Sequence, residues 1–194
     1  MLRQRLLRLI ERERRWAEAG QTAEIRAKMN SLVDTEIIQA LCAASRAGVD
    51  IRLNVRGICM LRPGVKDLSE SITVVSVVGR YLEHSRVFVF NNGGDKEVYL
   101  SSADWMTRNL DKRIELMFPI EASTCRRKVL ESLDAMFRDN VKGRRLSATG
   151  DYRVPEVGEW RTTARRAGDG HFEAQVVASR TGRAPELGGY LGSF

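Results

Sequence analysis

The chain has 194 residues, a length that fits one domain or one domain with a tail. Its apolar fraction of 43% is enough for a buried core and excludes a wholly disordered chain. The 32 lysines and arginines exceed the 25 acidic residues, and the formal net charge of +7 favours an anionic partner without choosing its class.

The cysteines and the apolar pattern exclude several other classes. Cys42, Cys59 and Cys125 are far apart, and only two histidines accompany them, so a zinc site is not expected. No stretch approaches the roughly 20 apolar residues that a membrane-spanning helix needs. Arginines and glutamates interrupt the apolar positions near the N-terminus, which argues against a secretory signal. We therefore expect a cytoplasmic protein with reduced thiols and no membrane span.

The first third of the chain predicts a helix and then a strand, a helix and a strand. Residues 2–19 place apolar side chains at helical spacing, and a glycine follows them. Residues 23–30 and 49–55 alternate apolar and polar side chains, which is the period of a strand. Between them, Ser31–Asp34 resembles a capping box for a helix that runs to Gly48. Because the joints are short, we expect these two strands to be parallel.

Further along the chain, five stretches have the pattern of a regular element. In chain order, they are a strand buried on both faces at residues 72–78, a hairpin of residues 87–90 and 97–102, a strand at residues 113–120, and an amphipathic helix at residues 122–138. From residue 141 onward no period is sustained, and nine of the sixteen glycines occur there. We therefore predict an α/β domain over residues 1–140 and a loosely packed, partly disordered tail over residues 141–194.

Arg56 is a candidate ligand-binding residue because of its position. It stands at the carboxyl end of the second predicted strand, just before Gly57. In open α/β sheets, ligands bind at the edge formed by the carboxyl ends of the strands. Arg56 is therefore a better candidate than arginines inside or before that strand.

His84 and Arg86 form a second candidate pair. A His-x-Arg spacing at the start of a strand places both side chains on one face. The histidine can exchange a proton with a phosphoryl oxygen, and the arginine can hold such an oxygen through two N–H groups. An isolated histidine is also a common structural residue, so the pair alone does not establish a site.

Two neighbouring stretches have both a functional and an ordinary interpretation. Ser101–Asp104 follows the paired strand and either lines the same pocket or is simply a turn, because serine and aspartate favour turns. Arg108, Lys112 and Arg113 are either a phosphate-binding cluster or an exposed stretch beside acidic residues. The residues alone indicate an α/β domain with a basic edge that carries a histidine.

Four motifs carry a family resemblance through roughly residues 5–140. They occur in order and at family-like spacing: Lys28–Asp34, Val55–Cys59 with Leu61–Gly64, Leu82–Arg86, and Tyr99–Asp111. Together they resemble the C-terminal catalytic domain of bacterial polyphosphate kinase. The resemblance implies a phospholipase D-like α/β fold with a mixed β-sheet flanked by helices, in which two similar domains pack face to face.

The same resemblance implies an activity and roles for His84, Arg56 and Arg113, to which the His-x-Arg spacing adds Arg86. Enzymes of this family transfer the terminal phosphate of ATP to inorganic polyphosphate, reversibly and with Mg²⁺. His84 and Arg56 match residues that bind the nucleotide phosphates, and His84 also assists the transfer. Arg86 and Arg113 would neutralise phosphate charge.

The resemblance also implies that part of the site lies in domains preceding this one. The histidine that becomes phosphorylated, the adenine-stacking tyrosine and the magnesium-contacting arginines belong there, and His171 is a poor substitute. We therefore expect a fragment that is inactive alone and whose partners are ATP or ADP, polyphosphate, and the remaining domains or a homo-oligomer. No specific nucleic acid is expected.

Two alternatives remain open from the sequence. One is a non-catalytic module that binds polyphosphate or a partner chain. The other is a phosphodiesterase of the phospholipase D type that acts as a homodimer. That class normally has His-x-Lys and a Gly-Ser-x-Asn loop, whereas Arg86 and a Ser-Ser-Ala-Asp loop stand here, so this alternative is less favoured.

Overall fold

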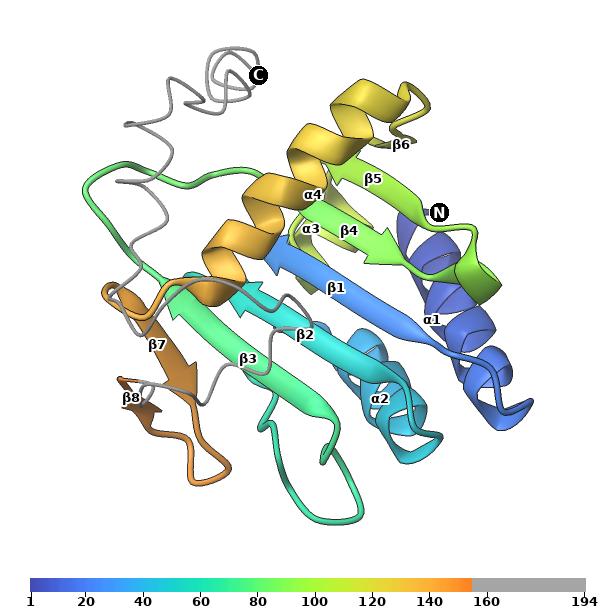
Figure 1. The fold of residues 1–194 in the computed structure, drawn as a ribbon, viewed down its shortest axis with the longest axis horizontal. Helices are drawn as coiled ribbons and strands as arrows, with labels where there is room; N and C mark the ends of the chain where they lie inside the picture. Colours follow the sequence, from blue (N-terminus) through green and yellow to red (C-terminus); the bar gives the residue numbers. More distant parts are fainter. Residues whose placement is uncertain (155–194) are drawn as a thin grey trace.

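A mixed eight-stranded sheet runs through the computed structural model, which describes residues 1–154 (Figure 1). The strand order is β6-β5-β4-β1-β2-β3-β7-β8. The predicted α/β class with a mixed sheet flanked by helices is confirmed. The tail beyond residue 154, including His171, lies outside the described residues.

The centre of the sheet is the predicted strand–helix–strand unit. Strand β1 (Glu24–Met29) pairs in parallel with β2 (Asp50–Val55), and α2 (Thr35–Arg46) connects them, as expected. Strand β3 (Ile72–Val77) continues in parallel with β2. The carboxyl ends of these three strands therefore meet at one edge, which faces the left-hand side of Figure 1.

The predicted hairpin is also present. Strands β4 (Val87–Phe90) and β5 (Glu97–Ser101) pair antiparallel, and a short 3₁₀ turn, η1 (Asn92–Gly94), joins them. Strand β4 also pairs antiparallel with β1. The start of β4 and the end of β5 thus lie at the same edge as the carboxyl ends of β1 and β2.

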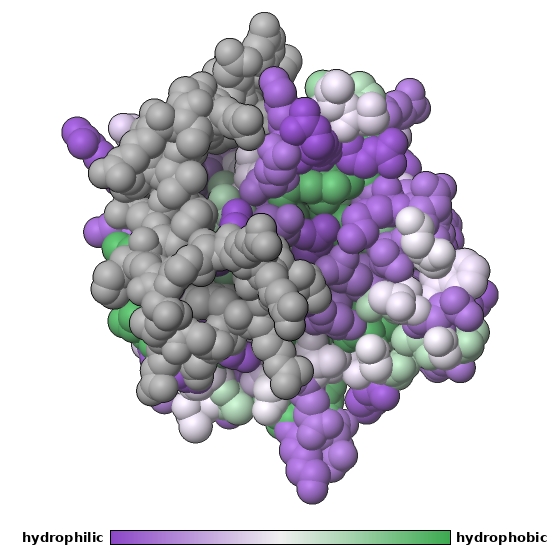
Figure 2. Space-filling model, in the orientation of Figure 1, coloured by the Kyte–Doolittle hydropathy of each residue, from purple (hydrophilic) through white to green (hydrophobic). Residues whose placement is uncertain are grey.

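Helices cover both faces of the sheet. Helices α1 (Leu2–Glu18) and α2 lie behind it in Figure 1, and α4 (Ser123–Arg138) crosses the front. The larger core lies under α1 and α2, where Phe88 and Trp105 stack with ring centroids 5.0 Å apart. The smaller core joins α4 to the front face, whose outer surface is mostly hydrophilic where Figure 2 describes it. The strand-central residues are therefore buried from both sides.

The capping box predicted at residues 31–34 is wrong. Asp34 is itself the N-cap of α2, and its Oδ1 accepts a hydrogen bond of 3.1 Å from the Ile37 amide. The chain stays extended before it because Leu32 forms β-bridges with both Cys59 and Trp105. These long-range pairings delay the start of the helix by one turn.

The other differences concern short elements late in the chain. The expected strand at residues 113–120 is limited to β6 (Met117–Pro119), and an unpredicted short helix, α3 (Thr107–Lys112), precedes it. Strands β7 (Gly143–Leu146) and β8 (Tyr152–Arg153) extend the sheet beyond β3, within the stretch that was expected to be irregular. The division of the chain at residue 140 stays a prediction.

Two further observations concern residues 1–154. None of their helices has the length and apolar character required to cross a bilayer. Cys42, Cys59 and Cys125 are all free thiols.

Candidate functional site

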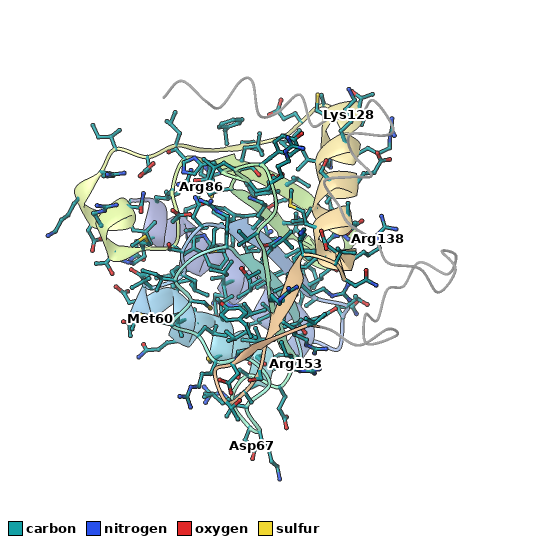
Figure 3. All side chains as sticks on the ribbon, turned by 90° about the vertical axis from the view of Figure 1, so that its left-hand side faces the viewer. Met60, Asp67, Arg86, Lys128, Arg138 and Arg153 are labelled. Atoms are coloured by element: carbon teal, nitrogen blue, oxygen red, sulfur yellow. The ribbon has the colours of Figure 1, made fainter. Side chains whose placement is uncertain are left out.

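The edge at the carboxyl ends of β1, β2 and β3 gathers the polar residues that the sequence singled out. Asn30 follows β1, Arg56 follows β2, and the loop of residues 78–86 leads from β3 into β4. Figure 3 faces this edge and shows Arg86 above Met60, which lies on the side of α2, with Arg138 farther to the right at the end of α4. The sheet topology therefore brings residues that are distant in sequence to one place.

The predicted His84–Arg86 pair is in direct contact. Arg86 Nη1 lies 3.3 Å from His84 Nδ1, and Arg86 Nη2 lies 3.5 Å from His84 Nε2. Arg86 Nη1 also donates to the His84 carbonyl oxygen at 3.2 Å. Partial burial lowers the pKa of His84 below its ordinary value, and the nearby Arg86 and Arg56 lower it further. The imidazole is therefore neutral at pH 7 and presents an acceptor nitrogen.

Asp104 fixes the other side of the Arg86 guanidinium. Arg86 Nε donates to Asp104 Oδ1 and Arg86 Nη2 donates to Asp104 Oδ2, both at 3.1 Å. Asp104 Oδ1 also accepts from the Asn30 backbone amide at 2.7 Å. Two-pronged pairing of this kind fixes the plane of the guanidinium as well as its position. Asp104 therefore orients Arg86 from the end of β5.

Asn30 passes the chain of contacts on to Arg56. Its Oδ1 accepts from Arg56 Nε at 3.2 Å and from Arg56 Nη2 at 2.9 Å, while its Nδ2 donates to Asp104. The Gly57 amide donates to the Asn30 carbonyl oxygen at 2.7 Å, and a Cβ on Gly57 would lie only 2.9 Å from that oxygen. Only glycine therefore lets the two strand ends approach this closely.

We call the continuous series His84, Arg86, Asp104, Asn30 and Arg56 the edge network. It contains two guanidinium groups and one carboxylate, and Lys28 lies beside it. Cations held by hydrogen bonds, together with a neutral imidazole, suit the recognition of phosphoryl oxygens. The arrangement can neutralise an anion and exchange a proton with it.

Arg113 and the serine loop are placed differently. Arg113 follows α3 and is exposed, and among residues 1–154 no hydrogen bond or ion pair links it to the edge network. The Ser101 hydroxyl donates to the Leu116 carbonyl oxygen at 2.8 Å, and the Ser102 hydroxyl bonds to the Glu115 carboxylate. Both serines therefore serve the loop structure, and Asp104 is the member of the loop that reaches the edge network.

The roles of Asn30 and Lys28 were not predicted from the sequence. Both stand on the polar side of the alternation predicted for residues 23–30, where side chains commonly face water, yet both are buried. The available signal was their position at the carboxyl end of a strand, the same argument that singled out Arg56.

The described residues contain no cluster of side chains that would form a metal site without a ligand. No group of three or more metal-ligating side chains gathers anywhere in residues 1–154. The Asp104 carboxylate already accepts hydrogen bonds from Arg86 and Asn30.

Comparisons with known proteins agree on one family. The family model described as "Polyphosphate kinase C-terminal domain 2" matches residues 1–165. A polyphosphate kinase from Rhodopirellula baltica is 54% identical over 151 residues, which are 78% of this chain and 18% of that protein. One from Synechocystis is 47% identical over 188 residues, 96% of this chain and 25% of that protein. The crystal structure of polyphosphate kinase from Porphyromonas gingivalis superposes with a TM-score of 0.82 at 38% identity, covering 95% of this chain and 27% of that one.

Proposed function

The chain belongs to the family of the polyphosphate kinase C-terminal domain 2, and we propose that it supplies one wall of a site that transfers the terminal phosphate of ATP to inorganic polyphosphate. The chain spans only 18% and 25% of two curated relatives, so the activity of a whole enzyme is part of the proposal. The observation that carries it is the edge network, which joins His84 to Arg56 through hydrogen-bonded partners.

Each predicted residue receives a role in this proposal. Arg56 and Arg86 neutralise phosphate charge, which is the main contribution of a protein to phosphoryl transfer. His84, neutral at pH 7, contacts a phosphoryl oxygen and moves a proton at that atom. Arg113 contacts an outer phosphate, because its exposed guanidinium is free to reach an extended anion.

The proposal assigns the phosphorylated histidine and the Mg²⁺ ligands to the remainder of the longer relatives. The described residues support this division because Asp104, the carboxylate of the edge network, is occupied by Arg86 and Asn30. Mg²⁺ would enter with the nucleotide, whose phosphate charge it would reduce. We further propose a reducing, cytoplasmic location, with which the three free cysteines agree.

The test compares the chain alone with the chain mixed with the other domains of a longer relative. The purified chain with ATP and Mg²⁺ is expected to form no polyphosphate, and mixing it with a chain carrying the other domains of a longer relative is expected to restore synthesis. His84→Ala and Arg56→Ala should each abolish the restored activity. Arg52→Ala is the matched control, because Arg52 lies on β2, the strand that Arg56 follows, but pairs with Asp50 at the opposite end of that strand.

Two outcomes would contradict the proposal. Synthesis by the chain alone that depends on His84 would show that the phosphorylated residue has been misplaced. Persistent inactivity after mixing, together with retained binding of polyphosphate, would favour the non-catalytic binding module.

A further inference from the structure

A buried lysine lies directly beneath the loop that carries His84. Lys28, on β1, is only 2% exposed. Its Nζ donates to the Glu83 carbonyl oxygen at 2.8 Å and to the Ser85 carbonyl oxygen at 2.9 Å. These two carbonyls belong to the residues on either side of His84, so one ammonium group holds the backbone at both flanks of the histidine.

We propose that Lys28 is the positioning residue of His84, holding the loop against the sheet so that the imidazole faces Arg86. The loop is anchored from two directions. Arg86 ties it to Asp104 at the end of β5, and Lys28 ties it to β1. The inference rests on the proposed function in that His84 is the residue that meets phosphate.

The chemistry of Lys28 indicates a role other than simple packing. Its hydrogen bonds run to backbone carbonyls and not to a carboxylate, and the burial of an ammonium group opposes folding. Burial lowers the pKa of Lys28 to about 8, and Arg56 and Arg86 act in the same direction against Glu83 and Asp104. A methionine of similar length would fill the position without this cost. The lysine therefore orders the loop at the expense of overall stability.

The first experiment compares two buried cations on one strand. Lys28→Met removes the contacts with the loop. Arg26→Met is the matched control, because Arg26 lies two residues earlier on the same face and bonds instead to Asp134 of α4. Backbone order parameters of residues 83–86 are expected to fall from about 0.85 to below about 0.6 only in Lys28→Met. The thermal midpoint of that variant should be unchanged or higher.

The second experiment uses the unaltered chain and reads the histidine ring by NMR. The sequence has two histidines, and the signal lost in His84→Gln identifies His84. Because the pKa of His84 lies below its ordinary value while that of Lys28 is about 8, the ring's own titration precedes that of the lysine as the pH rises. The other charged groups that face Lys28 are Arg56, Arg86, Glu83 and Asp104, and guanidinium and carboxyl groups ordinarily titrate far from pH 8. A second step in the His84 ring shift near pH 8 would therefore report Lys28.

This step should disappear in Lys28→Met and persist in Arg26→Met. Its absence from the unaltered chain would overturn the proposal, even if Lys28→Met failed to fold. Equal loosening of the loop in both variants would also overturn it. Neither experiment contains nucleotide, so a failure here is distinct from a failure of polyphosphate synthesis in the mixing assay.

Discussion

Asp104 is the residue at which the two halves of the edge network converge. Its carboxylate receives both prongs of Arg86 and the backbone amide of Asn30. The side chains of Arg86 and Asp104 are 13% and 9% exposed, so water screens their interaction only weakly. Asp104 therefore fixes the Arg86 guanidinium in place, whereas Arg56 is held by the neutral amide oxygen of Asn30.

Replacing Asp104 by asparagine should destabilise the chain clearly. The change leaves Arg86 one of its two hydrogen bonds to residue 104 and no counter-charge in a mostly buried place, for which we expect a loss of about 3 kcal/mol of unfolding free energy. Urea denaturation measures it. Asp50→Asn is the control, because the Arg52–Asp50 pair is 29% and 49% exposed and should cost less than about 1 kcal/mol. Equal losses would show that Asp104 has no special electrostatic role.

At the scale of single residues, local sequence pattern predicted Arg56, His84 and Arg86 as candidate binding residues but not the residues that hold them in place. Asn30 and Lys28 acquire their roles from the register of β1, which pairs with β2 on one side and β4 on the other. That register pairs Lys28 with Val87, which are about 60 residues apart, so no short stretch of sequence reveals it. Sequence pattern could therefore place Asn30 and Lys28 near the carboxyl edge, but it could not predict which residues they contact.

Among the elements, β7 depends on an unusually tight connection to α4. The Asp139 Oδ1 accepts hydrogen bonds from the amides of Val141, Lys142 and Gly143 at 3.0, 2.8 and 3.1 Å. A Cβ on Gly143 would lie 2.0 Å from the Asp139 carbonyl oxygen. The backbone oxygen cannot move without breaking this turn, so only glycine fits the start of β7.

Gly143→Ala is therefore expected to loosen β7 from β3. The forced backbone shift should lower the unfolding free energy by about 1–3 kcal/mol and speed amide exchange across residues 143–146, while β1 and β2 keep their protection. Gly150→Ala is the control on the β7–β8 hairpin. It has open space around it but a φ of +97°, so its cost should be a conformational one of about 1 kcal/mol without the exchange effect. Unchanged exchange in β7 after Gly143→Ala would contradict the steric argument.

The elements that were predicted correctly are those with a sustained local period. Residues 2–18 and 123–138 form helices, and the alternating stretches form β1 and β2. The start of α2 was misjudged because the β-bridges of Leu32 extend the preceding chain. Strand β7 was missed because it has four residues, including glycine and two arginines, and its partner β3 supplies the order.

At the scale of the whole molecule, the apolar cores that stabilise the fold and the candidate site lie in different parts of the structure. Two apolar cores on opposite faces of the sheet hold the chain together. The carboxyl edge instead collects cations that repel one another, and Arg56 and Arg86 both lower the pKa of Lys28. Such an edge is suited to binding an anion. Until an anion binds, repulsion between the cations lowers the stability of the fold. The pH dependence of stability should reveal that weakening.

The pKa of Lys28 is lowered from 10.5 to about 8, so between these values the unfolded chain binds more protons than the folded chain. The unfolding free energy therefore rises with pH across this window, by on the order of 3 kcal/mol from this group. Urea denaturation under reducing conditions at several pH values measures it. The difference in unfolding free energy between the unaltered chain and Lys28→Met isolates the contribution of the lysine. Relative to Lys28→Met, the unaltered chain should become more stable as the pH rises. Arg26→Met should show no such trend relative to the unaltered chain. If the free-energy difference for Lys28→Met did not change with pH, the buried ammonium would not be destabilised.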